Sequence, residues 1–302
     1  MALRAHRRVE RRWPTHGGPG PATQLASTGW HHGGVISADQ VPLLEFDPRT
    51  PAVVEPSTTQ REIDAPRAAV ACFFPEVVAE WAADGEPILD LPAREQLWQV
   101  RRAGQKLAVF YPGMGAPLAA SRLERVIAAG CKTIVACGAA GALVPGLEMG
   151  RDVITVSAAV RDEGTSYYYV PPARTITASR DVVSVLTAAA TRRGEPHRVG
   201  MTWTTDGYFR ETPNRVERRK AEGCITVEME AAALFAVAAF RGVRFGQYLY
   251  AGDDLAGEVW DHRKWWDSPM RHNLSELAAE ASLVLADRSL DSSRLFDSGN
   301  RV

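Results

Sequence analysis

The stretch ITVEMEAAALFAVAAF (225–240) contains a strand that runs straight into a helix. Its first three residues, Ile225–Val227, suit a buried strand, and the apolar run after Met229 suits a helix. Glu228 and Glu230 flank Met229 at the junction. Residues two apart near a helix start project in different directions, so both carboxylates cannot simply lie on one solvated face. This stretch therefore predicts an α/β fold with two acids at a strand–helix junction.

The same alternation extends in both directions. Apolar runs with the length of buried strands are AAVACFF (68–74), KTIVAC (132–137), RDVITVSAAV (151–160), HRVGMTWTT (197–205) and VRFGQYLYAGDD (243–254). Helices are predicted near 75–83, 116–129, 181–193, 212–223 and 269–286, and a strand pair at 95–100 and 106–112. The pattern predicts one α/β domain over residues 66–287, with a mostly parallel sheet covered by helices on both faces.

The segments outside this domain differ in composition. Residues 1–34 are rich in arginine and glycine and predict a disordered extension, with an organellar presequence or a nucleic-acid-binding arm as alternatives. Residues 35–65 contain several prolines and little periodicity, which predicts an extended lead-in segment across the surface. Residues 288–302 are expected to form a C-terminal tail.

Composition restricts the function classes. The 302 residues are 45% hydrophobic and 24% charged, as is usual for a globular protein, and the net charge of −1 favours neither nucleic acid nor an anionic membrane as partner. No apolar run approaches the ~20 residues of a membrane span. The spacing of the cysteines suits neither a zinc site nor a disulfide framework, so no metal is expected. The sequence predicts buried thiols in a reducing, cytoplasmic compartment for Cys72, Cys131, Cys137 and Cys224.

Chemistry is expected where the predicted strands end, because ligands of such sheets bind beyond the carboxyl ends of the strands. GAAGAL (138–143) lets backbone amides approach an anion or a sugar, although a structural turn explains it equally well. RDEGTSYYYVPP (161–172) is either a binding loop or a surface loop with packed tyrosines. AGDDLAG (251–257) closes the last strand with Asp253 and Asp254, in a pattern that also forms common turns.

The order of these motifs, together with TTDGYF (204–209) and VEMEA (227–231), resembles the nucleoside phosphorylase superfamily. This superfamily includes purine nucleoside phosphorylases, uridine phosphorylases and methylthioadenosine-type nucleosidases, and RDEGTSYYYVPP is closest to the uridine phosphorylase branch. The resemblance covers roughly residues 66–287. It implies a single α/β domain around a mixed, partly barrel-like sheet, and a homo-oligomer in which a neighbouring subunit completes each active site.

The resemblance also implies roles for particular residues. Glu230 would hold the ribose 2′- and 3′-hydroxyls, with Met229 packed against the sugar and Glu228 beside it. Tyr208 would stack on the nucleobase. Asp253 would protonate the base as it leaves, which requires a raised pKa. Uridine phosphorylases recognise uracil with a Gln and an Arg in the place of Thr212 and Asn214, so the resemblance leaves the identity of the base open.

The acceptor of the ribosyl group is the point where this chain departs from the family pattern. Phosphorylases hold phosphate with a glycine and an arginine after the first strand, where this chain has FFPEVVAE (73–80). The remaining phosphate ligands implied by the resemblance are Arg94, lent by a neighbouring subunit, and the backbone at Gly138 and Ala139. Phosphorolysis of a nucleoside, with phosphate as co-substrate and no cofactor, is the preferred prediction.

Two alternatives stay open. The nucleosidase branch activates water with a glutamate after the first strand, and Glu76 lies at about that position, so the chain could be a nucleoside hydrolase. A non-catalytic nucleoside-binding or storage protein is the alternative of another class. The aromatic stretch WDHRKWWD (260–267) is either a lid over the base or surface packing.

Overall fold

The computed structural model describes residues 41–48, 51–59, 63–148, 150–257, 260–262 and 269–287. The segments predicted as an extension (1–34) and a tail (288–302), and most of the aromatic stretch after Trp260, lie outside these residues. Within the predicted lead-in segment the chain forms two short helices, η2 (Pro42–Leu44) and α1 (Pro56–Thr59).

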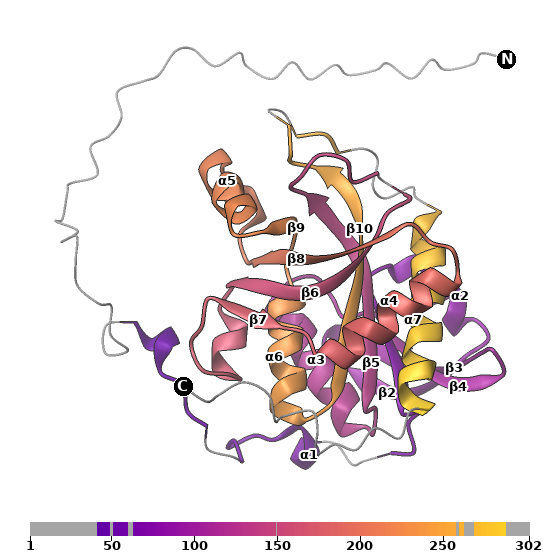
Figure 1. The fold of residues 1–302 in the computed structure, drawn as a ribbon. Helices are drawn as coiled ribbons and strands as arrows, with labels where there is room; N and C mark the ends of the chain where they lie inside the picture. Colours follow the sequence, from indigo (N-terminus) through magenta and orange to yellow (C-terminus); the bar gives the residue numbers. More distant parts are fainter. Residues whose placement is uncertain are drawn as a thin grey trace, which may run out of the picture.

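The rest of the chain combines strands and helices, with β2 to β4 and β5 to β7 following one another without a longer helix between them (Figure 1). The strands are β1 (Ala68–Cys72), β2 (Glu86–Leu91), β3 (Glu95–Arg102), β4 (Gln105–Phe110), β5 (Thr133–Ala142), β6 (Val153–Asp162), β7 (Thr175–Thr177), β8 (His197–Thr205), β9 (Cys224–Glu228) and β10 (Arg244–Asp254). The longer helices are α2 (Pro75–Ala82), α3 (Ala116–Ala128), α4 (Arg180–Arg192), α5 (Pro213–Ala221), α6 (Ala231–Arg241) and α7 (Met270–Asp287). Short 3-10 helices are η3 (Pro92–Arg94), η4 (Thr165–Tyr168) and η5 (Tyr208–Arg210).

The sheet closes on itself at one end. Its order is β10-β6-β8-β9-β5-β1-β4-β3-β2, and β10 also pairs with β5, so β5, β9, β8, β6 and β10 form a ring. The ring can close because β5 has different neighbours on one side along its length, β1 first and β9 after it. Its first half pairs with β1, its last residues pair with β9, and β10 runs parallel to it throughout. Parallel and antiparallel pairs both occur, which confirms the mixed, partly barrel-like sheet.

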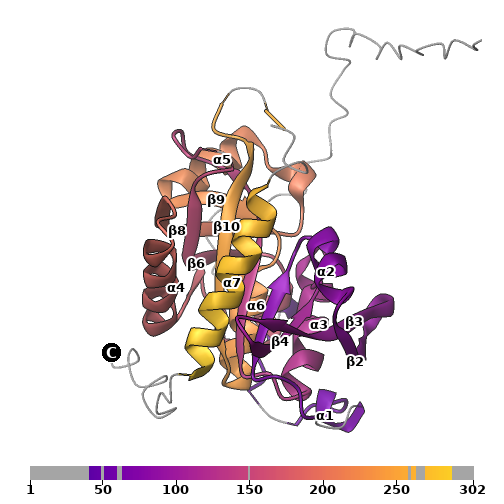
Figure 2. The same ribbon diagram turned by 90° about the vertical axis from the view of Figure 1, so that its right-hand side faces the viewer.

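Helices cover both faces of this sheet (Figures 1 and 2). α2, α4 and α7 pack on one face through a core that includes Val77, Leu186 and Leu277. α3 and α6 pack on the other face. Most of α6 is buried, which explains why its sequence is alanine-rich and apolar on every side. These two layers confirm the α/β class predicted from the sequence.

Most predicted strands and helices are confirmed, and the differences have physical reasons. The strand predicted at 132–137 continues to Ala142, so the glycine-rich motif lies inside β5 and is not a loop beyond its end. The small residues of this motif lie where the neighbouring strand of β5 changes from β1 to β9. β2 was not predicted, because EPILDL is a largely exposed strand with a proline and two acids. β7, with only three residues, gives too short a pattern to detect.

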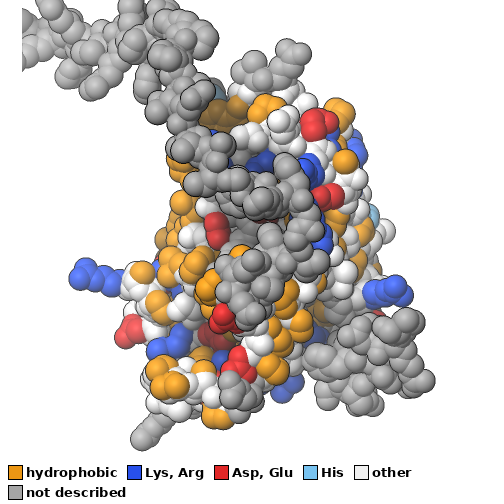
Figure 3. Space-filling model, turned by 90° about the vertical axis from the view of Figure 1, so that its left-hand side faces the viewer, with side chains coloured by type: hydrophobic (Ala, Val, Ile, Leu, Met, Phe, Trp, Pro, Cys, Tyr) orange, Lys and Arg blue, Asp and Glu red, His pale blue; other side chains and the backbone are white. Residues whose placement is uncertain are grey.

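Two further findings concern the surface. On the face shown in Figure 3, apolar, acidic and basic side chains alternate over the described residues, without a continuous field of one charge. The helices within the described ranges lack the combination of length and apolar character that a membrane crossing needs. All four cysteines are free and buried, as predicted.

Candidate active site

Glu228 holds the junction between β9 and α6. Its Oε2 accepts hydrogen bonds from the amides of Glu230 (2.7 Å) and Ala231 (2.6 Å), which are the first amides of α6. The Thr204 hydroxyl donates to its Oε1 (2.7 Å) and accepts a bond from the Ala232 amide. A carboxylate in this position satisfies orphan amides and complements the helix dipole. Both oxygens of Glu228 are thus engaged by the protein, which gives this residue a structural task.

Glu230 is the N-cap residue of α6, and its carboxylate points at a second helix start. The amide of Gly115, the N-cap residue of α3, donates to its Oε1 at 2.6 Å. Only 7% of Glu230 is exposed. Burial raises its pKa, and the nearby Glu228 carboxylate raises it further. A ligand that offers hydroxyl donors would stabilise the ionised form here. Met229, between the two acids, remains partly exposed.

The glycine-rich part of β5 lies beside this junction. β9 runs antiparallel to β5, with Val227 opposite Gly141, so the chain after Val227 runs back toward Gly138. An added Cβ at Gly138 would lie 3.3 Å from the Cβ of Phe73, which follows β1. Ala139 pairs with Tyr250 of β10. The structure therefore gathers the ends of β1 and β9 around this segment of β5.

An ion pair lies just after the end of β1, between two residues that are 195 positions apart in the sequence. The guanidinium of Arg271, in the first turn of α7, donates to the Glu76 carboxylate in the first turn of α2. The Arg271 guanidinium also lies over the Phe74 ring, 5.2 Å from its centroid. Burial raises the pKa of Tyr111, and the carboxylates of Glu230 and Glu76 both contribute. Tyr111 thus lies within electrostatic reach of both acids. Sequence reasoning missed Arg271, because no local pattern links it to Glu76.

Arg94 occupies a strained turn. Ala93 and Arg94 both have φ of 60°, a conformation that costs non-glycine residues of order 1–3 kcal/mol. The buried Arg122 of α3 holds this turn, since it donates to the Pro92 carbonyl (3.1 Å) and to the Tyr111 carbonyl (2.8 Å). The Arg94 side chain itself is exposed.

Asp253 ends β10, which pairs with β5, and Tyr208 begins η5, after β8. Asp253 stands opposite Gly141, just after a register shift in β10, and its Oδ2 accepts a hydrogen bond from the Trp260 indole (2.7 Å). Tyr208 is half exposed, and its ring contacts that of Phe209 in a tilted arrangement, with 4.0 Å between ring centroids. The neighbouring Glu211 is half-buried, and burial together with the charge of Asp253 raises its pKa to about 7. Sequence reasoning did not single out Glu211.

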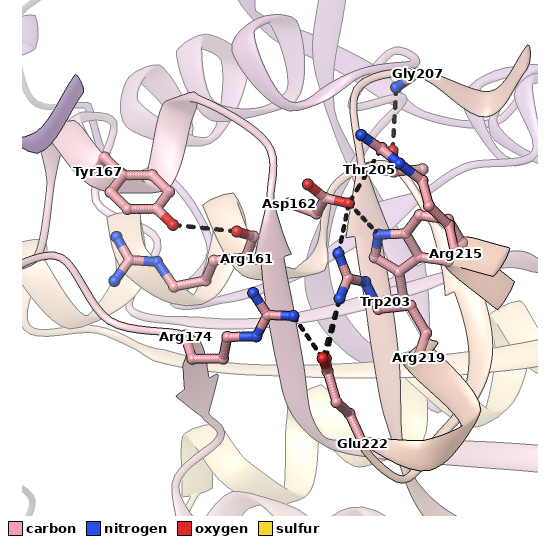
Figure 4. Close-up of polar contacts among 10 residues, drawn as sticks. All are labelled: Arg161, Asp162, Tyr167, Arg174, Trp203, Thr205, Gly207, Arg215, Arg219 and Glu222. Carbon is pink, nitrogen blue, oxygen red and sulfur yellow. Dashed lines mark hydrogen bonds and ion pairs between the residues drawn. The ribbon is translucent and has the colours of Figure 1, made fainter. Parts of the chain in front are cut away.

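The first two residues of the predicted loop RDEGTSYYYVPP, Arg161 and Asp162, form hydrogen bonds with other parts of the protein (Figure 4). Asp162 accepts hydrogen bonds from the Trp203 indole (3.0 Å) and from Arg219 of α5 (2.9 Å). Arg161 donates to the Ser166 hydroxyl (2.9 Å) and to the Pro171 carbonyl (2.7 Å). The Asp162 contacts tie the end of β6 to β8 and α5, and the Arg161 contacts hold the loop that follows β6. Both side chains therefore have structural partners.

The described residues contain no cluster of three or more His, Cys, Asp or Glu side chains placed to hold a metal ion. Of the residues proposed from the sequence, Glu228, Met229, Glu230, Gly138 and Ala139 lie around one segment of β5, with Asp253 on the adjacent strand. Glu76 is at the end of β1, and Arg94 is on an exposed turn.

Comparison with known proteins agrees with this arrangement. Residues 67–290 match the model of the family described as the phosphorylase superfamily. Guanosine phosphorylase of Halorubrum lacusprofundi is 32% identical over 143 residues, which are 47% of this chain and 59% of that relative. Uridine phosphorylase of Thermococcus kodakarensis is 35% identical over 156 residues, 47% of this chain and 56% of that relative. The matches thus span between half and two thirds of these relatives.

A likeness to a solved structure supports the fold. The crystal structure of purine nucleoside phosphorylase from Toxoplasma gondii superposes with a TM-score of 0.66 at 21% identity, over 74% of this chain and 92% of that one. The resemblance seen in the sequence is therefore confirmed, and the chain belongs to the phosphorylase superfamily.

Proposed function

We propose that this protein cleaves the N-glycosidic bond of a nucleoside by phosphorolysis, yielding the free base and ribose 1-phosphate. The observation that carries the proposal is the buried Glu230 carboxylate at the meeting point of α3 and α6. Glu230 forms no ion pair with any residue that the structure describes, and a buried acid of this kind is costly unless a ligand uses it. The names of the relatives, guanosine and uridine phosphorylase, support nucleosides as the substrate class.

In this proposal Glu230 binds the sugar. Its carboxylate accepts hydrogen bonds from the vicinal ribose hydroxyls, each charge-assisted bond contributing about 1.5–3 kcal/mol. Met229, partly exposed beside it, packs against the ribose. Glu228 acts indirectly, because its bonds to the first amides of α6 fix the position of Glu230.

The chemical step is a displacement at C1′. A phosphate oxygen forms a bond to C1′ while the C1′–N bond breaks. The electron pair of the broken C1′–N bond goes to the nitrogen of the base. Asp253 delivers a proton to the departing base, which contributes typically ~10²–10⁴-fold to the rate. Tyr208 stacks on the base, and the half-exposed position of its ring leaves a face available.

Phosphate is held, in this proposal, by Arg94 of a neighbouring copy and by the backbone at Gly138 and Ala139. The exposed position of Arg94 on a strained turn suits a residue that reaches another subunit. The Arg271–Glu76 pair favours phosphate over water as acceptor, because the guanidinium occupies the carboxylate that would otherwise hold the attacking water. The proposed reaction needs no cofactor besides phosphate, and the free cysteines support a cytoplasmic location.

The test is incubation with purine and pyrimidine nucleosides, with and without phosphate, followed by identification of both products. We expect ribose 1-phosphate and free base, formed only when phosphate is present. Free ribose at a rate independent of phosphate would instead establish the nucleoside hydrolase. Binding without turnover would establish a nucleoside-binding protein.

A further inference from the structure

Arg122 of α3 is a buried cation that binds two separate segments of the chain. Its side chain is 4% exposed, and its Nε and Nη1 donate to the carbonyls of Pro92 (3.1 Å) and Tyr111 (2.8 Å). The Glu95 carboxylate lies 3.9 Å from Nη1, which is too far for a hydrogen bond. The guanidinium therefore ties the start of η3 to the residue that follows β4, through neutral backbone carbonyls.

The backbone leaves room for this guanidinium at Gly113. An added Cβ there would lie 3.1 Å from Nη1 of Arg122 and 2.5 Å from Cδ2 of Leu118, and the φ of Gly113 is 84°. A buried guanidinium costs desolvation free energy, and an apolar side chain of similar volume would fill the same space at lower cost. Packing alone therefore gives no reason for an arginine at position 122, whereas its two bonds to carbonyls do.

The turn that Arg122 binds is strained. Pro92 begins η3, and Ala93 and Arg94 follow it, both with φ of 60°. Such residues persist only where the surrounding structure holds them in place, because each costs of order 1–3 kcal/mol. The bond from Arg122 to the Pro92 carbonyl acts directly before the two strained residues, and β2 and β3 pair on either side of the turn. Arg122 is thus placed to set the conformation of Arg94.

The same helix also contacts the acid that binds the sugar in the proposed function. α3 begins after Gly115, whose amide donates to the Glu230 carboxylate. The contact to Glu230 and the contact to η3 are made by different residues of α3. A change of the Arg122 side chain should therefore disturb the turn that carries Arg94 and leave the bond between Gly115 and Glu230 in place.

We propose that Arg122 is a positioning residue that holds Arg94 in the conformation in which it binds phosphate. Without its bonds to the carbonyls of Pro92 and Tyr111, η3 relaxes out of the strained conformation, and the Arg94 guanidinium moves away from the phosphate of the neighbouring copy. Arg122 itself touches neither substrate. This inference rests on the proposed function, in which Arg94 is a phosphate ligand, and it adds the residue on which the binding of that co-substrate depends.

A double-mutant cycle tests whether Arg122 acts through Arg94. Steady-state kinetics with inosine or uridine, whichever is cleaved faster, compare the wild type, Arg122→Met, Arg94→Ala and the double variant. Arg122→Met should raise the KM for phosphate at least about tenfold and leave the KM for the nucleoside within about twofold. The kcat/KM for phosphate of the double variant should equal that of Arg94→Ala, because a residue that acts through another adds nothing once the other is removed. Additive losses, or an unchanged KM for phosphate in Arg122→Met, would overturn the proposal.

Arg219→Met is the matched control. Arg219 is equally buried, and its guanidinium bonds to Asp162 and Glu222, which belong to other segments. Its loss should lower the free energy of unfolding without a change in the KM for phosphate, and an equal rise in that KM would overturn the proposal. Arg122→Lys should give an intermediate KM, because an ammonium lacks the planar fork that serves two carbonyls. Should Arg122→Met fail to fold, Arg122→Lys replaces it in the cycle.

Binding of inorganic phosphate separates this inference from the proposed function, because it needs no turnover. Calorimetry with phosphate alone should give a Kd at least about tenfold higher in Arg122→Met and in Arg94→Ala than in the wild type, and an unchanged Kd in Arg219→Met. Phosphate binding that depends on both arginines, without any nucleoside cleavage, would overturn the proposed function and leave the positioning role standing. Phosphate-dependent cleavage with an unchanged Kd in Arg122→Met would overturn the positioning role alone. A wild-type protein that binds no phosphate would overturn both.

Discussion

At the residue scale, two acids two positions apart have different surroundings. Both oxygens of Glu228 accept hydrogen bonds, from Thr204 and from the start of α6, whereas Glu230 receives the Gly115 amide at the start of α3. The sequence predicted both acids at the strand–helix junction. The resemblance assigned the sugar hydroxyls to Glu230 and placed Glu228 beside it. The sequence could not show that Glu228 caps α6, because one of its donors, Thr204, comes from β8, far away along the chain.

The two acids should respond differently to the loss of charge. Glu230→Gln should leave the fold intact and lower kcat/KM by at least ~10³-fold, because a neutral amide loses the charge-assisted grip on the ribose hydroxyls. Glu228→Gln should instead lower the free energy of unfolding by about 1–2 kcal/mol, because the cap of α6 is weakened. Denaturant unfolding and steady-state kinetics on both variants check this. Near-wild-type activity in Glu230→Gln contradicts the ribose assignment.

At the scale of elements, β5 shows what could be predicted and what could not. Its buried first half was evident from KTIVAC, since a continuous apolar run suits a strand covered on both faces. Its second half was interpreted as a loop, because glycine and alanine are typical of turns as well as of close approaches between strands. The ion pair of Arg271 with Glu76, and the electrostatic influence of Asp253 on Glu211, link segments that are far apart in the sequence. No spacing in the sequence encodes them.

The close approach at Gly141 yields a stability prediction. A Cβ added there would lie 2.5 Å from Leu255 Cδ1 and 2.9 Å from Val227 Cγ1, both of which must move. Gly141→Ala should therefore cost about 1–3 kcal/mol of unfolding free energy, as overpacking usually does. Gly164→Ala is the matched control, since its Cβ would meet only ordinary contacts at 3.8 and 3.9 Å. Both variants are unfolded with urea. Equal free energies of unfolding would show that β5 tolerates a side chain at position 141.

At the scale of the whole molecule, the proposal that Arg94 serves a neighbouring copy makes the active site a property of the assembly. Arg94→Ala and Glu230→Gln should each be nearly inactive alone. If each site takes Glu230 from one copy and Arg94 from the other, co-refolding equal amounts in a dimer should restore about a quarter of the wild-type sites. Activity assays after mixing check this, with each variant co-refolded alone as control. If activity stays at the level of the single variants, Arg94 serves its own subunit or none.

The ring of β5, β9, β8, β6 and β10 has a consequence for how copies of the chain meet. Because β10 returns to β5, the path of the sheet has its long open edge at β2. An open edge presents unpaired backbone groups to any passing strand and invites aggregation. β2 carries Pro87, which cannot donate a hydrogen bond, and the exposed Glu86 and Asp90. The same proline and acids that hid this strand from the sequence pattern protect the folded protein from uncontrolled fibre-like growth.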